Sequence, residues 1–216
     1  MTLDDGQRPE SGMEWNLNLA GWFGGIDIYL FDQLQKGRFD GRRSVLDVGC
    51  GTGRNLVYFL RSDFDVCAID ADPGTVDAVR SLAARLAPGL PPENFRVAAA
   101  DGIPFEDARF DAVLASAVLH FAVDEPHFER MLHEMWRVLA PGGLFFTRLA
   151  SSIGIEDRVE RIDGRRHRLP DGSERFLVDE AMLLRATDRL GGKLIDPIKT
   201  TNVQNLRCMT TWCLEK

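Results

Sequence analysis

The chain has 216 residues, of which 44% are hydrophobic and 27% are charged. This composition supports one globular domain with a sizeable core and excludes a disordered chain. The net charge of −7 argues against a duplex nucleic-acid partner, since phosphate binding usually needs a basic surface. The sequence has no apolar run of membrane-spanning length, and its N-terminus, MTLDDGQRPESGMEW, is unlike a signal peptide. We therefore expect a cytoplasmic protein, monomeric or homodimeric, without a membrane or nucleic-acid partner.

The four cysteines are scattered along the chain, without a CxxC pair: Cys50, Cys67, Cys208 and Cys213. This distribution favours reduced thiols in a reducing compartment over a disulfide framework.

Residues 1–43 precede the first predicted strand. The segment Asp27 to Leu34 has a helical pattern, and Trp22 lies in a stretch rich in aromatic residues and glycines. Such a segment is either a mobile cover over a site or a hydrophobic cap on the sheet. We favour the cap, because apolar residues more often pack than bind ligands.

Residues 44–150 alternate between strand and helix patterns, which predicts a cofactor-binding core. The expected strands are Ser44–Val48, Phe64–Ile69, Phe95–Ala99, Phe110–Ala115 and Leu144–Leu149, and the expected helices are Arg54–Leu60, Pro73–Leu86 and Glu125–Leu139. The turn Ala140-Pro141-Gly142-Gly143 should end the last of these helices. This alternation indicates a mostly parallel sheet with helices on both faces.

The end of the chain departs from that pattern. Residues 151–177 form a polar insertion on the expected substrate side, followed in residues 178–216 by a helix and two strands, Lys193–Val203 and Arg207–Leu214. These strands are too close in sequence for a crossover helix, so they should pair antiparallel. The fold class is therefore α/β: a Rossmann-like, doubly wound, seven-stranded sheet whose last strand is antiparallel.

The stretch VLDVGCGTGRN, residues 45–55, combines three glycines at alternate positions with an acid, Asp47. A dinucleotide-binding turn has the spacing GxGxxG, and a phosphate-binding P-loop needs a lysine followed by serine or threonine, where this chain has Arg54 and Asn55. An acid beside the loop suits a ligand that carries a cationic amine better than it suits a phosphate.

Five motifs occur in an order that is similar to one known family. DVGCGTG, CAIDAD, AAADGIPF, FDAVLASAVLHF and WRVLAPGGLFF together resemble class I S-adenosylmethionine-dependent methyltransferases, over roughly Ser44 to Leu149. The resemblance implies methyl transfer from S-adenosylmethionine by in-line displacement, with S-adenosylhomocysteine as product and without a metal. It also implies that Asp70 binds the ribose hydroxyls and that Asp101 accepts from the adenine amino group.

The cofactor-binding residues expected from these motifs are Asp47, Gly49, Cys50, Gly51, Gly53, Asn55, Asp70, Ala71, Asp101, Gly102, Ile103 and Ser116. Some of them have structural alternatives. The glycines could serve a tight turn, Asp101 could be a turn residue, and Cys50 is best explained as a small filler. The neighbouring Asp72 is expected to cap a helix.

The motifs say less about the residues that contact the methyl acceptor. His120, just past the fourth strand, is the best candidate for a general base, with packing as the alternative. Arg148 or one of the arginines of residues 151–176 could hold an anionic substrate group, and Arg148 is the best candidate because it lies in an otherwise apolar strand. Trp22 and Tyr29 are further candidate substrate contacts. The arginines and acids of residues 151–177 nearly balance, which favours a salt-bridged hairpin or helix-loop. The sequence contains no HxxxH pair or carboxylate cluster that would predict a metal site.

Residues 115–118, Ala-Ser-Ala-Val, lack the NPPY-like or DPPY-like motif of methyltransferases that act on base amines. A small-molecule acceptor is therefore the main hypothesis. A catalytically silent S-adenosylmethionine-binding sensor or partner protein is the alternative, because the same motifs would serve both. A nicotinamide-dependent oxidoreductase is disfavoured by the GxGxG spacing.

Overall fold

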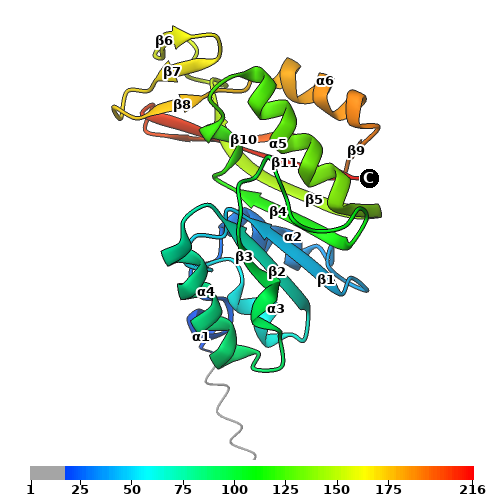
Figure 1. Ribbon diagram of the computed structural model, residues 1–216. Helices are drawn as coiled ribbons and strands as arrows, with labels where there is room; N and C mark the ends of the chain where they lie inside the picture. The colour runs from blue at the N-terminus through cyan, green and yellow to red at the C-terminus, as the bar shows by residue number, and fades with distance from the viewer. Residues whose placement is uncertain (1–17) are drawn as a thin grey trace, which may run out of the picture.

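The computed structural model describes residues 18–216; residues 1–17, where the expectation about a signal peptide falls, lie outside the described residues. Its main sheet follows the order β10-β11-β5-β4-β1-β2-β3, with β9 paired to β11 (Figure 1). The strands are β1 (Ser44–Val48), β2 (Asp65–Asp70), β3 (Phe95–Val97), β4 (Phe110–Ser116), β5 (Leu139–Ser151), β9 (Lys193–Leu194), β10 (Lys199–Val203) and β11 (Arg207–Glu215).

The strand directions confirm the predicted class. β1 pairs in parallel with β2 and β4, β2 with β3, and β4 with β5, whereas β11 pairs antiparallel with both β5 and β10. The strand order changes direction at β1, with β2 on one side and β4 on the other. In open α/β sheets a ligand crevice forms at such a point, beyond the carboxyl ends of the strands.

Helices cover both faces of the sheet (Figure 1). On one face α2 (Ile28–Gln35), α3 (Val57–Arg61) and α4 (Pro73–Leu86) pack in one apolar cluster. On the other face α5 (Glu125–Val138) and α6 (Glu180–Leu190) pack in a second cluster. The short helices are α1 (Leu19–Phe23), η1 (Pro92–Asn94) and η2 (Leu119–Phe121). None of the helices in the described part of the chain is long and apolar enough to cross a membrane.

Local capping explains where α4 begins. The Asp72 side chain accepts hydrogen bonds from the backbone N–H groups of Gly74 and Thr75, and Pro73 occupies the first turn. An N-cap carboxylate satisfies donors that would otherwise lack partners, and proline there sacrifices no helical hydrogen bond. The predicted capping role of Asp72 is therefore confirmed, and it directs the end of β2 into the helix.

Three of the predicted boundaries differ most from the structure, and smaller differences include β3, which ends at Val97 rather than Ala99. Helix α3 begins at Val57 rather than Arg54, because the glycine loop continues as turns to Leu56. The predicted strand Lys193–Val203 is divided into β9 and β10 by a stretch that contains Pro197 and cannot form a continuous ladder. β5 begins at Leu139, before the predicted start at Leu144. Its pairing with β4 shifts in register between Phe110 and Ala112, so the Pro-Gly-Gly segment forms a bulge within the strand.

The insertion at residues 151–177 contains a separate three-stranded sheet of β6 (Glu160–Asp163), β7 (Arg166–Arg168) and β8 (Glu174–Phe176). Glu174 pairs with Arg166 and Arg168 across these strands. Phe176 stacks on Phe128 of α5, with ring centroids 5.2 Å apart. The expected salt-bridged hairpin is thus extended by one strand and anchored to the main body near the carboxyl ends of β4 and β5.

Candidate functional site

The glycine loop follows β1 and runs beside the end of β2. Gly49, Gly51 and Gly53 have φ values of +67°, +50° and +81°, a region that side chains with a Cβ rarely adopt. A Cβ added at Gly51 would meet no atom of residues 18–216 within 4 Å. The Gly51 N–H donates to Asp70 Oδ2 at 2.9 Å. The loop therefore keeps open space next to its backbone, and Asp70 fixes its position.

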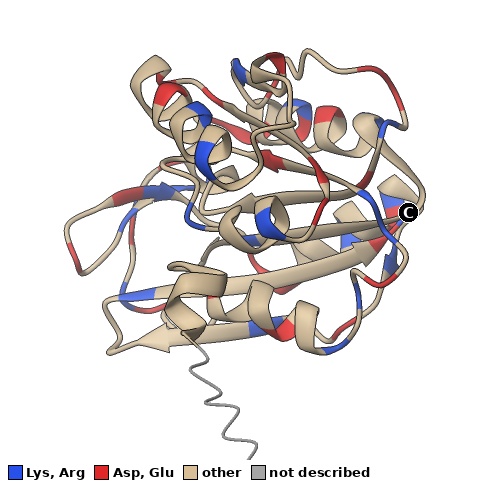
Figure 2. Cartoon of the chain, turned by 90° about the horizontal axis from the view of Figure 1, so that it is seen from below, with Lys and Arg blue, Asp and Glu red and all other residues tan. Residues whose placement is uncertain are grey.

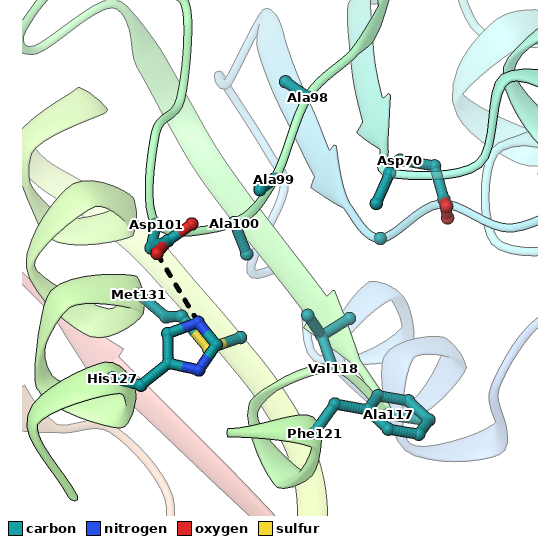
Figure 3. Close-up of a pocket in the computed structure, with 12 residues that line it drawn as sticks. Asp70, Ala98, Ala99, Ala100, Asp101, Ala117, Val118, Phe121, His127 and Met131 are labelled. Carbon is teal, nitrogen blue, oxygen red and sulfur yellow. Dashed lines mark ion pairs between the residues drawn. The ribbon is translucent and has the colours of Figure 1, made fainter. Parts of the chain in front are cut away.

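A cavity of about 340 Å³ lies beside this loop (Figure 3). It is bounded by the ends of β1, β2 and β4, by the segment after β3 and by the first turns of α5. Its lining residues are Gly49, Asp70, Ala71, Ala98, Ala99, Ala100, Asp101, Ala117, Val118, Phe121, His127 and Met131. The cavity thus presents two carboxylates and one imidazole on otherwise apolar walls, which suits a nucleoside with polar edges.

Asp70 and Asp101 stand at separate parts of this cavity (Figure 3). Asp70 uses one oxygen for Gly51 and the other for the Asp72 N–H, at 3.0 Å, and each oxygen has a further lone pair. Asp101 lies 3.5 Å from His127 Nε2 and 3.9 Å from Arg130 Nε. Both carboxylates therefore have acceptor capacity at the cavity, as the predicted ribose and adenine contacts require.

Asp47 is 1% exposed, and its Oδ2 has no hydrogen-bond partner in the part of the chain described. Burial raises the pKa of this carboxyl to about 7, while Arg54 opposes the shift. A buried acceptor without a partner is costly unless a ligand or a proton satisfies it. A cationic amine is the kind of group that would do so, which is an observation in favour of the expected cofactor.

Several predicted cofactor contacts instead have partners within the protein. The N–H groups of Gly102 and Ile103 donate to Ala99 O and to Glu134 Oε2, and Ile103 is buried in the core. Asn55 Oδ1 accepts from the Asp27 N–H at 2.9 Å. These residues lie outside the cavity lining, as do Ser116, Asp47, Cys50, Gly51 and Gly53. Their contacts with the cofactor stay predictions from the motif.

Cys50 is buried, and its thiol pKa lies well above the ordinary value because burial disfavours the thiolate. Gly53 approaches Leu82 of α4 so closely that a Cβ there would lie 2.9 Å from Leu82 Cδ2. The two residues therefore act in packing, Cys50 as the small filler that the sequence suggests and Gly53 at the contact between loop and helix.

A second and larger cavity, of about 670 Å³, meets the first one. Both are lined by Ala117 and Phe121. The other residues around it come from the turn after the glycine loop, from η2, from β5, from the insertion and from the β10–β11 hairpin: Arg54, His120, Arg148, Ala150, Leu169, Asp171, Ser173, Arg175, Val203, Arg207 and Met209. The insertion thus contributes directly to the wall of this cavity.

Ala117, at the junction, has a φ of +66° and its N–H donates to Arg148 O at 2.7 Å. A residue with a Cβ pays for this conformation with about 1–2 kcal/mol. Such strain persists where the surroundings over-determine it, commonly at binding sites. The strained turn brings the chain out of β4 between the two cavities.

His120 lines the second cavity but is held in a form that disfavours the predicted base role. Its Nδ1 accepts the Ala150 N–H at 3.2 Å, so the proton of the neutral ring belongs on Nε2. Burial, with a contribution from Arg175, lowers its pKa to about 4. At neutral pH His120 is therefore an uncharged donor, and both of its nitrogens are unsuited to take a proton.

The Arg148 guanidinium is held by Asp27, a residue that the sequence patterns did not indicate. Arg148 Nη1 donates to Asp27 Oδ2 at 3.0 Å, and the Ser116 hydroxyl lies 3.3 Å from the same oxygen. Arg54 Nη2 is 3.5 Å away. Asp27 is buried and also caps α2 by accepting from the Tyr29 N–H. The cluster ties the start of α2 to the ends of β4 and β5.

Trp22 and Tyr29 were expected to touch substrate, and the structure places them elsewhere. Trp22, on α1, is 48% exposed and faces Arg61 of α3. The Tyr29 hydroxyl hydrogen-bonds to Thr201 of β10, and its ring lies 5.1 Å from the Arg148 guanidinium carbon. Tyr29 therefore supports Arg148 from outside the cavity. α1 and α2 present these aromatic rings to neighbouring helices and to β10.

Residues 45–143, just under half of the chain, match a family model described as a methyltransferase domain. The chain is 32% identical over 126 residues to malonyl-(acyl-carrier protein) O-methyltransferase of Serratia marcescens, an alignment that covers 57% of this chain and 46% of that protein. The chain therefore spans less than half the length of this curated relative.

Two solved structures have similar folds at 18–20% identity. One is the 1,6-didemethyltoxoflavin-N1-methyltransferase of Burkholderia thailandensis with bound 1,6-didemethyltoxoflavin and S-adenosylhomocysteine, with a TM-score of 0.65 over 92% of this chain and 84% of that one. The other is the (4+2)-cyclase SpnF, with a TM-score of 0.67 over 88% and 80%. The domain match, the ordered motifs and the sheet topology support the expected likeness of residues 45–143 to class I S-adenosylmethionine-dependent methyltransferases.

Proposed function

We propose that the protein transfers a methyl group from S-adenosylmethionine to a small-molecule acceptor. The observation that carries this proposal is the junction of the two cavities at Ala117 and Phe121. One cavity offers carboxylates on apolar walls at the end of β1 and β2, and the other is large enough for a small organic molecule. Ligands bound in the two cavities would meet at the strained turn after β4.

Asp70, Asp101 and Asp47 are the residues that would hold the cofactor. Asp70 and Asp101 line the first cavity, and the buried Asp47, outside that lining and two residues before Gly49, has an Oδ2 without a partner among residues 18–216. When bound, S-adenosylmethionine supplies a methyl group on a positively charged sulfur, which is already activated for displacement. The protein's own contribution is to align the acceptor and to exclude water.

The hydrogen bonding of His120 favours a methyl acceptor that is already nucleophilic and needs no general base to remove a proton. Its Nδ1 is occupied by the Ala150 N–H, so Nε2–H is the group available to a ligand. A donor of this kind orients an oxygen or nitrogen of the acceptor and does not remove its proton. His120 is thus proposed as a positioning residue at the acceptor cavity.

The comparisons support a small-molecule acceptor and do not select one. The Burkholderia methyltransferase structure has 1,6-didemethyltoxoflavin bound, whereas the Serratia relative is named for an acyl-carrier protein. A similar fold also occurs in the (4+2)-cyclase SpnF, so fold alone does not establish methyl transfer. Binding and turnover must therefore be measured separately.

The test is to incubate the protein with S-adenosylmethionine labelled as a CD₃ group and a small-molecule cell extract, followed by mass spectrometry for labelled products. We expect a CD₃-labelled product with the wild-type protein and a strongly reduced yield with Asp70→Asn. Asp72→Asn, an exposed neighbour that keeps its capping group, serves as the matched control. Cofactor binding without a labelled product across several extracts would instead support the silent binding protein.

A further inference from the structure

The second cavity is basic although the chain as a whole is acidic. The charged side chains in its lining are four arginines, Arg54, Arg148, Arg175 and Arg207, and one carboxylate, Asp171. The chain carries a net charge of −7, and Figure 2 shows acidic and basic segments interspersed along it. A concentration of one sign of charge in a cavity raises the local concentration of ligands of the opposite sign.

The arginines differ in how far the protein already neutralises them. Arg148 is paired with the buried Asp27 at 3.0 Å and is 19% exposed. Arg54 reaches the same carboxylate only at 3.5 Å, so the two arginines share one negative charge. Among residues 18–216 this pair therefore adds one excess positive charge to the cavity, and Arg54, 49% exposed, has the looser contact.

Arg175 and Arg207 approach the cavity from the insertion and from β11. Arg175 Nη1 donates to the Glu174 carbonyl oxygen, and its guanidinium carbon lies 5.0 Å from the centre of the Phe121 ring. Arg207 Nη1 is 3.8 Å from Asp171 Oδ2, beyond hydrogen-bond distance, and its side chain is 55% exposed. Each guanidinium has five N–H donors, so within residues 18–216 most of the donors of both arginines are available.

The remaining walls of the cavity are largely apolar. Leu169 of the insertion, Val203 of β10 and Met209 of β11 face it, and Phe121 separates it from the first cavity. His120 adds one neutral donor through Nε2. A fitting ligand therefore has an apolar body for these walls and an oxyanion for the arginines, within reach of the junction at Phe121.

We propose that the methyl acceptor is a small organic acid, an apolar body bearing a carboxylate or phosphate group, whose anion is bound by Arg175 and Arg207. This inference rests on the proposed function, since it names the substrate class of the same site. Guanidinium groups bind both anions through paired N–H donors, and the apolar walls favour a ligand that also has an apolar body. Arg148 is already paired with Asp27, so it forms part of the cavity wall and does not bind the anion.

The experiment is calorimetric titration of the full chain with phenylacetate, phenyl phosphate and neutral phenylacetamide, with and without S-adenosylhomocysteine, at constant ionic strength. We expect one or both anions to bind at least about tenfold more tightly than the amide, and the two anions reveal which group the site prefers. Arg175→Gln and Arg207→Gln should each weaken anion binding about fivefold or more, while S-adenosylhomocysteine affinity is unchanged.

The matched control is Arg168→Gln, on the same small sheet but outside the cavity, where Arg168 pairs with Glu160 and Glu174. Its anion affinity should equal that of the wild-type chain. Equal binding of phenylacetate and phenylacetamide would overturn the proposal. So would a loss of S-adenosylhomocysteine affinity in Arg175→Gln, because that arginine would then belong to the cofactor site.

The two proposals fail separately. Anion binding that depends on Arg175 and Arg207 in a chain that does not bind S-adenosylhomocysteine would refute methyl transfer and leave the organic-acid site. Tight S-adenosylhomocysteine binding without a preference for anions would refute the organic-acid acceptor and leave methyl transfer intact.

Discussion

Replacing Asp27 with asparagine removes one negative charge from beneath two arginines and keeps the size of the side chain. The Asp27 carboxylate accepts from Arg148 at 3.0 Å and from Ser116 at 3.3 Å, and its other oxygen caps α2. Asparagine is itself a good N-cap, so the Tyr29 N–H keeps its acceptor. The variant therefore isolates the loss of charge in the cluster.

The expected cost follows from the exposure of the partners. Breaking a fully buried ion pair costs about 3–5 kcal/mol, and a hydrogen bond to a charged group contributes about 1.5–3 kcal/mol. Arg148 is 19% exposed, so water partly solvates it once Asp27 is neutral. We expect Asp27→Asn to lower the free energy of unfolding by about 2–3 kcal/mol, which for a chain of this size lowers Tm by roughly 4–12 °C.

Urea denaturation followed by circular dichroism gives the free energy directly, provided that the m-value is unchanged. Asp32→Asn is the control, because Asp32 lies on the same helix in a more exposed pair with Lys36 and should cost about 1 kcal/mol or less. If Asp27→Asn costs no more than Asp32→Asn, the buried cluster does not stabilise the junction between α2 and the sheet.

Three further predictions concern titratable groups. Because burial raises the pKa of Asp47 to about 7 from 3.8, the unfolding free energy of the wild type relative to Asp47→Asn should fall as pH rises from about 4 to 7, and urea titrations that show a rise would contradict this. Nitrogen-15 NMR should show His120 with its proton on Nε2 and uncharged above pH about 5; an Nδ1–H tautomer would refute the assignment. The four buried cysteine thiols should react with a disulfide reagent only upon unfolding, so rapid labelling of Cys50 in the native chain would show that its loop opens.

Much of the fold could be predicted because its determinants are local. The apolar run of β1, the Asp72-Pro73 start of α4 and the short link between β10 and β11 each constrain a few neighbouring residues. These features indicate strand, helix and antiparallel pairing without knowledge of the rest of the chain. The parallel core and the antiparallel last strand were therefore predicted correctly.

The candidate site was predicted less completely because its contacts join distant parts of the chain. Asp27 meets Arg148 across 121 positions, and His127 faces Asp101 from another element. Neither pairing leaves a periodic signal in the sequence. Trp22 is 48% exposed on α1 and lines neither cavity, so its substrate contact stays a prediction.

Calorimetric titration with S-adenosylhomocysteine, for the wild type, Asp70→Asn and Asp72→Asn, tests most directly whether the cavity beside the glycine loop is the cofactor site. Asp70 lines that cavity and Asp72 does not. Saturable one-to-one binding that is weakened about tenfold or more in Asp70→Asn, and unchanged in Asp72→Asn, is the predicted result. No binding by the wild type, or equal affinity in all three proteins, would contradict the account.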